Sequence, residues 1–226
     1  MTTHTITRLG AGAGAAYVLL AITGSDILGA GSTPATDASP AAFARWLTAN
    51  QPTGAGWIAP FLELLALLCF VVFSAALYDR LRSAEHERTW LPTAALGAGL
   101  VSAALKVGSA PAMLAAFQLT PGGIDPQLAA VLVNIDNFAF LLTWAIDAVM
   151  IGAVAAVALR TAVLPRWIAV SGAVLAPLLL VSLAGGDNGP PVFLLALLWF
   201  VAVSVALASP ASRARTAASS AAPAAS

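Results

Sequence analysis

The chain has 226 residues, of which 60% are hydrophobic and only 9% are charged, and its formal net charge is zero. A soluble domain usually has about 25% charged residues, so this composition excludes a water-soluble globular protein. The balanced charge also gives no basic surface of the kind that binds a nucleic acid.

Six apolar segments are long enough to cross a bilayer, for which a helix needs roughly 20 residues. In chain order they cover about residues 9–28, 57–77, 90–112, 128–159, 167–183 and 192–207. A helix satisfies its own backbone hydrogen bonds, as the hydrocarbon requires. The sequence therefore predicts an all-α integral membrane bundle with six transmembrane helices in one domain, residues 1–208. Residues 209–226, rich in Ala and Ser, are predicted to be a disordered cytoplasmic tail.

The first segment has a second interpretation. Arg8, the apolar run after it and the small residues at 29–31 are also typical of a cleaved signal peptide. Asp26, late in the run, argues against cleavage. The distribution of arginines also argues against it, because that distribution is consistent only if the first span persists.

The arginines indicate the orientation. With six spans, eight arginines fall on one side of the membrane and Arg45 alone falls on the other. Basic residues concentrate on the cytoplasmic side, so both termini are predicted to be cytoplasmic in a multi-pass protein of the cell membrane. The eight are Arg8, Arg80, Arg82, Arg88, Arg160, Arg166, Arg213 and Arg215.

Several smaller features accompany the spans. In the long outer loop, residues 41–47 are predicted to form an interfacial helix whose apolar side carries Phe43, Trp46 and Leu47. Glycines in two spans are predicted to permit close helix packing, and prolines in spans three and five to mark kinks or helix ends. These residues are Gly10, Gly12, Gly14, Gly97, Gly99, Gly108, Pro111 and Pro177.

Ionisable side chains inside the predicted spans are the main indication of chemistry. A charge near the bilayer centre costs about 2.5–3.5 kcal/mol, so such residues are candidates for a functional site. Counted along the helices, four of them lie at similar depth, nearer the outside, and Asn137 adjoins one of these. The candidates are Asp26, Glu63, Lys106, Asp136, Asn137 and Asp147.

Lys106 is predicted to pair with Glu63 or Asp136. The acids in the spans outnumber this base four to one, so some of them must be hydrated or protonated. Asp136 and Asp147 share one helical face with Phe140 and Thr143, which predicts a polar stripe towards the cytoplasmic half.

Structural interpretations of the same residues stay open. Asp26 could be merely interfacial, Lys106 and one acid could clamp two helices together, and Asp147 could hydrogen-bond across a packed interface.

No cofactor or metal is expected. Cys69 is the only cysteine, which excludes a disulfide framework and a multi-cysteine metal site. The two histidines lie outside the apolar runs, so a bis-histidine haem within the bilayer is excluded. Residues 85–88, with the sequence EHER, lack a second histidine at helical spacing and are interpreted as a solvated charged turn.

One segment carries a family resemblance. Residues 164–172, with the sequence LPRWIAVSG, resemble a recurring element of an uncharacterised bacterial polytopic membrane-protein family, domain-of-unknown-function family 4386. A glycine-rich first span, a long outer loop and the span end LYDR at 77–80 are similar too. The resemblance covers most of residues 6–205. It implies a helical bundle and carries no activity with it.

The leading hypothesis is an outward-facing polar pocket, formed by the candidate residues, that binds or transports a small amphipathic or lipid-like ligand with proton coupling. One alternative is an intramembrane enzyme that uses a protonated carboxylic acid on an isoprenoid or lipid substrate. The acids weakly resemble those of small membrane-bound terpenoid cyclases in this respect, although no specific motif matches. The other alternative is a structural membrane subunit, and a homo-oligomer is compatible with each hypothesis.

Overall fold

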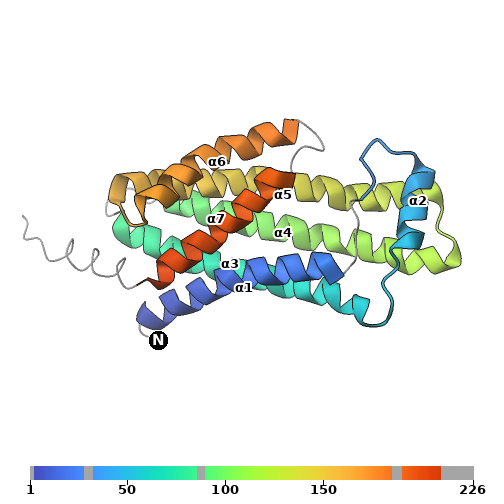
Figure 1. The fold of residues 1–226 in the computed structure, drawn as a ribbon, viewed down its shortest axis with the longest axis horizontal. Helices are drawn as coiled ribbons and strands as arrows, with labels where there is room; N and C mark the ends of the chain where they lie inside the picture. Colours follow the sequence, from blue (N-terminus) through green and yellow to red (C-terminus); the bar gives the residue numbers. More distant parts are fainter. Residues whose placement is uncertain (1–2, 28–32, 86–89, 185–189, 210–226) are drawn as a thin grey trace, which may run out of the picture.

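The computed structural model describes residues 3–27, 33–85, 90–184 and 190–209, apart from the side chains of residues 3–8, 25–27, 184 and 190. All regular elements within these ranges are helical (Figure 1). In chain order they are α1 (Thr3–Ile27), α2 (Pro40–Ala49), the 3-10 helix η1 (Gly54–Ile58), α3 (Ala59–Ala84), α4 (Trp90–Leu119), the 3-10 helix η2 (Thr120–Gly122), α5 (Pro126–Thr161), α6 (Arg166–Ala184) and α7 (Pro190–Ala208).

Five helical segments of the described chain are long and apolar enough to cross a membrane. They are Gly54–Ala84, Trp90–Gly122, Pro126–Thr161, Arg166–Leu183 and Pro191–Ala208. The remaining long helix, α1, contains a shorter apolar stretch, Leu9–Gly24. The predicted fold class, an all-helical membrane bundle, is confirmed.

The six long helices alternate in direction, so the start of α1 and the end of α7 lie at the same end of the bundle (Figure 1). Arg80 and Arg82 near the end of α3, and Arg160 and Arg166 around the α5–α6 connection, belong to this end. Arg45, on α2, belongs to the opposite end. The two ends are named inner and outer below after the predicted orientation of the chain. Within the described part, the arginines therefore segregate as six crossings predict. Arg8, Arg88, Arg213 and Arg215 lie outside the described side chains.

The apolar side of helix α2 packs against protein rather than against lipid. At about 1.5 Å per residue, α4 and α5 are about 45 and 54 Å long, more than the roughly 30 Å of hydrocarbon. Across their outer ends lies α2, whose Phe43 and Leu47 are fully buried. These two pack in one cluster with Phe117 and Val133. The predicted helix exists, but its apolar side is covered by α4 and α5.

Two of the glycines in α1 set how closely the helices approach. A Cβ at Gly14 would collide with Phe73 on α3 and Ser204 on α7, and one at Gly10 would collide with Ala76. The packing prediction is thus confirmed for both. It is wrong for Gly12, Gly97 and Gly108, where an added Cβ would meet no atom within 4 Å. Pro111 and Pro177 lie inside α4 and α6, so neither ends its helix.

The inner end holds an ion pair that corrects one prediction. Glu85, at the end of α3, is 8% exposed and accepts a charge-assisted hydrogen bond from Arg160 of α5. The interpretation of residues 85–88 as a solvated turn is therefore wrong for Glu85, because a distant helix supplies its cation. Residues 86–88 lie outside the described ones.

Candidate functional site

An ion pair joins α4 to α5 in the outer half of the bundle. The ammonium of Lys106 lies 3.0 Å from Oδ1 and 3.1 Å from Oδ2 of Asp136. The hydroxyl of Ser109, one helical turn along α4, donates to Oδ1 at 2.7 Å. The Lys106 and Asp136 side chains remain 21% and 16% exposed. Of the two predicted partners, Asp136 is the one that pairs with the lysine.

Glu63 is the second acid at this pair. It lies half-buried on α3 and interacts electrostatically with both Lys106 and Asp136. In the described part of the chain, no hydrogen bond or ion pair engages its carboxylate. Gly24 of α1 leaves room for it, since a Cβ there would stand 3.2 Å from Cγ of Glu63. Glu63, Lys106 and Asp136 together are called the outer cluster below.

The outer cluster has more acid than base. With both carboxylates ionised it carries one surplus negative charge, and that charge resides at Glu63 because Asp136 is occupied by Lys106. An uncompensated charge in a membrane-spanning segment is costly. The surplus carboxylate must therefore be hydrated, or take up a proton or a cation. Chemically, a proton and a cation would compete for it.

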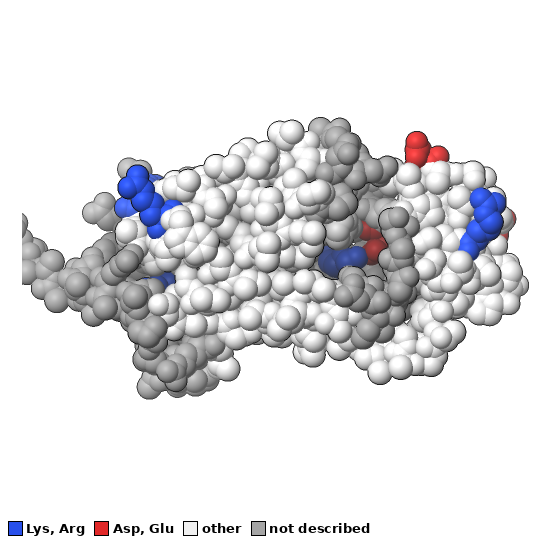
Figure 2. All heavy atoms as spheres, viewed as in Figure 1, with Lys and Arg blue, Asp and Glu red and all other residues white. Residues whose placement is uncertain are grey.

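The depth of the acids follows from the inner arginines. At about 1.5 Å per residue, Glu63 lies about 28 Å from Arg82, and Asp136 about 36 Å from Arg160. The hydrocarbon is about 30 Å thick, so the outer cluster lies near its outer boundary. Asp147, about 20 Å from Arg160 by the same rise, lies well inside. Figure 2 shows basic and acidic atoms together in a hollow between the two ends of the molecule.

Asp147 is separate from the outer cluster. It is 1% exposed, and its Oδ1 has no hydrogen-bond partner within the described chain. Ser102 on α4 is a hydrogen-bonding neighbour, and Tyr17 on α1 lies within electrostatic range. On the predicted stripe between the acids, Thr143 donates to the backbone carbonyl of Ala139 at 2.8 Å.

One predicted member, Asn137, is not brought to the cluster. The amide of Asn137 makes a long contact, 3.5 Å, with Oδ1 of Asn134. Asn134 in turn donates to the carbonyl of Thr36 at 3.3 Å, which ties α5 to the outer loop. Asp26 belongs to α1, but its side chain lies outside the described residues.

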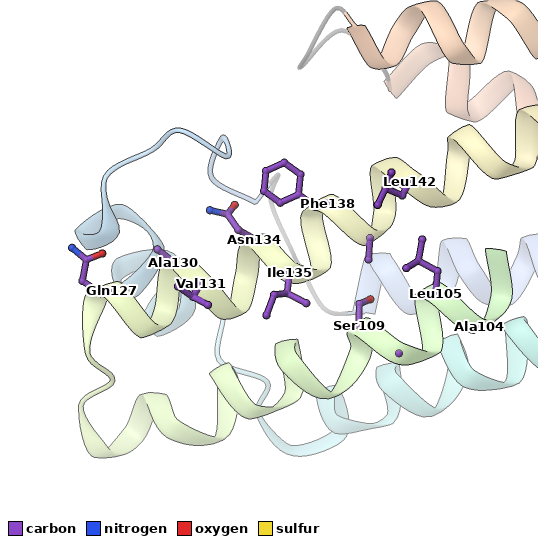
Figure 3. Close-up of a pocket in the computed structure, with 12 residues that line it drawn as sticks. Ala104, Leu105, Ser109, Gln127, Ala130, Val131, Asn134, Ile135, Phe138 and Leu142 are labelled. Carbon is purple, nitrogen blue, oxygen red and sulfur yellow. The ribbon is translucent and has the colours of Figure 1, made fainter. Parts of the chain in front are cut away.

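An apolar groove of about 770 Å³ runs between α4 and α5 (Figure 3). Leu105 and Ser109 line it from α4, and Val131, Ile135 and Phe138 line it from α5. The three side chains from α5 are 46–56% exposed, so the groove opens onto the surface that faces lipid. No carboxyl group lines it. It is therefore unlike the closed, acid-centred cavity that the enzyme alternative requires.

The sequence interpretation missed the hydroxyl groups that accompany the charged residues. Ser102, Lys106 and Ser109 recur at positions i, i+4 and i+7 and so share one face of α4. That spacing is the signal that could have identified both serines. No three His, Cys, Asp or Glu side chains among the described residues lie close enough together to hold a metal ion.

Comparison with known proteins supplies no relative. No protein-family profile matches the chain, and no similar curated protein or solved structure was found. The family resemblance of residues 164–172 stays a prediction. The function is therefore argued from the geometry of the described residues.

Proposed function

We propose that this multi-pass protein of the cell membrane binds a small amphipathic ligand with a cationic group at the outer cluster, and passes it on in exchange for protons. The observation that carries the proposal is the position of Glu63, a half-buried acid within electrostatic range of an ion pair that is already complete. A purely structural clamp needs one acid and one base, and the second acid is surplus to that role.

The charge of the cluster supports a cationic ligand. Both oxygens of Asp136 accept from the Lys106 ammonium, so an anionic ligand would have to break that pair in order to bind the lysine. A cation instead compensates Glu63 and leaves the pair intact. A proton neutralises the same carboxylate, so proton and ligand exclude each other.

The surroundings support an amphipathic ligand. The ring of Phe140 lies 5.8 Å from the Lys106 ammonium. Phe61 and Phe138, each two positions along the chain from an acid of the cluster, are 71% and 53% exposed. A molecule that reaches Glu63 near the outer boundary therefore meets apolar surface around one acid. Amphiphiles take up this position in a bilayer, with the charged group at the boundary.

Thermal unfolding of the purified protein in a maltoside detergent tests the proposal. The probes are nonyltrimethylammonium and nonyl sulfate, which share a chain and differ in charge. Because a ligand stabilises the state that binds it, the cation should raise the unfolding midpoint and the sulfate should not. Lowering the pH should weaken the effect, since protons then occupy the carboxylate.

The matched variants are Glu63→Gln and Asp79→Asn. Both remove one negative charge from α3, but Asp79 is exposed near the inner end of the helix. The shift should vanish in Glu63→Gln and persist in Asp79→Asn. Equal shifts in both variants would show that the amphiphile acts elsewhere, and would overturn the proposal.

A structural clamp is the second candidate, favoured by the two-oxygen contact of Lys106 and the hydrogen bond from Ser109. It predicts that removal of the outer cluster changes stability alone. A cation-induced shift in the wild-type protein that depends on Glu63 contradicts it. The enzyme alternative gains no support from the described groove, which is lined by no carboxyl group.

A further inference from the structure

Asp147 is an acid in the middle of the membrane that the proposed function does not use. It lies 11 positions beyond Asp136 on α5, which is about 16 Å. Its side chain is 1% exposed, and its Oδ1 has no hydrogen-bond partner within the described chain. One turn earlier, the indole Nε1 of Trp144 is likewise buried and unpartnered. Unsatisfied polar atoms on adjacent turns are unusual in a packed interior.

Among the described side chains, no cation reaches Asp147 from the helices packed around it. The only lysine, Lys106, is engaged by Asp136. The described part of α7 has no ionisable side chain, and α6 has only Arg166, at its first residue. On α3, Cys69 is the only titratable group between Glu63 and Tyr78.

Two side chains that carry hydroxyl groups interact with the acid. Ser102 approaches it from α4 as a hydrogen-bonding neighbour, and Tyr17 interacts with it from α1. Tyr17 is itself enclosed by aromatic rings, with Phe70 at 4.7 Å and Phe200 at 6.0 Å between centroids. The polar groups that these contacts place around the acid are therefore neutral, as is the indole N–H of Trp144 one turn earlier.

The free-energy costs decide between the charged and neutral forms. Burying a carboxylate without a cation has a large desolvation cost even after relaxation. A neutral acid with one unsatisfied oxygen costs much less free energy. We infer that Asp147 is a proton-binding site, which holds an exchangeable proton as a neutral carboxylic acid between Ser102 and Tyr17. The site does not depend on the ligand of the outer cluster.

On the face of α4 that meets α5, polar side chains lead from Asp147 towards Asp136. Ser102, Lys106 and Ser109 follow each other at rises of about 6 and 5 Å, from the level of Asp147 to Asp136. When the proton leaves the carboxyl O–H, the hydroxyl of Ser102 can turn to donate to the carboxylate that remains. Both states of Asp147 thus have a partner, as reversible exchange requires.

Infrared spectroscopy of the full chain in lipid tests the inference. The spectrum of wild type minus Asp147→Asn should contain a C=O stretching band of a protonated carboxyl group. The band should shift when the buffer is changed to D₂O. It should persist in Asp136→Asn, where a paired acid is removed, and move in frequency in Ser102→Ala, because it reports the hydrogen bond to the acid.

Two results would overturn the inference. Absence of the band means that Asp147 is ionised, and a band that does not shift in D₂O means a sealed, structural acid. If Asp147→Asn does not fold, wild type and Ser102→Ala labelled with ¹³C in the Asp carboxyl groups give the same comparison. The readout needs no ligand, so failure of cation binding at Glu63 leaves it unaffected.

Discussion

Lys106 and Asp136 face each other across α4 and α5, with the ammonium 3.0 and 3.1 Å from the two carboxylate oxygens. Glu63 stands within electrostatic range of both. This arrangement makes the two partners of the ion pair unequal. If Asp136 is lost, Glu63 remains to compensate the lysine, whereas loss of Lys106 leaves two acids with no base.

Lys106→Met is therefore expected to destabilise the protein more than Asp136→Asn does. The larger loss should be at most about 3 kcal/mol, because breaking a buried pair costs about 3–5 kcal/mol and these side chains are partly exposed. Unfolding in mixed micelles at increasing sodium dodecyl sulfate measures both. Adding Glu63→Gln to Lys106→Met should recover part of the loss. Equal losses of stability in the two single variants would show that Glu63 does not compensate the charge of Lys106.

Gly14→Ala and Gly12→Ala should change stability in opposite directions. The added Cβ at position 14 collides with Phe73 and Ser204, whereas at position 12 it meets open space. Overpacking costs about 1–3 kcal/mol, and alanine is favoured over glycine in a helix by up to about 1 kcal/mol. The same unfolding assay compares them. A stabilised Gly14→Ala would contradict the close approach of α1 to α3 and α7.

Arg160→Ala should cost about 1–3 kcal/mol, the penalty of an unsatisfied buried polar group. The cost arises at Glu85, which is 8% exposed and would lose its cation. Adding Glu85→Gln should restore much of the stability, since the amide carries no charge. Arg82→Ala is the matched control, because Arg82 is exposed and, within the described chain, its side chain contacts only Tyr78. Equal losses from Arg160→Ala and Arg82→Ala would argue against the buried pair.

Phe43→Ala should loosen the outer end of the bundle. Removing a fully buried phenylalanine costs about 3–5 kcal/mol, and here the loss falls on the contact of α2 with α4 and α5. Limited proteolysis from the outer side should then cut near α2. Phe61→Ala, which removes a ring that is 71% exposed, should leave the pattern unchanged. Resistance of both variants to the protease would contradict the docking of α2.

The orientation can be tested with single cysteines in a Cys69→Ser background. On intact cells, a membrane-impermeant maleimide should label Arg45→Cys and should not label Arg82→Cys until the cells are permeabilised. The expectation follows from the cytoplasmic concentration of basic residues. The reverse pattern would invert the orientation and place the outer cluster near the cytoplasm.

Much of this architecture is determined by the sequence alone. The deficit of charge and the length of the apolar segments predict a helical membrane bundle, because lipid admits only segments that satisfy their own backbone. The alternation of arginines predicts that the described ends of α1 and α7 share one side. Even the need of Lys106 for an acid follows from the cost of an isolated charge in hydrocarbon. Each of these is a property of one segment and its solvent.

Only the tertiary structure decided which acid pairs with Lys106, and that Asp147 lies apart between Ser102 and Tyr17. Only the structure, too, showed that Glu85 is buried. These facts depend on how each helix is rotated about its axis and on which distant segment packs against it. Hydropathy is averaged over all faces of a helical segment. It therefore indicates how deep a side chain lies in the membrane, but not the direction in which the side chain points. The pairing of charges is set by that direction.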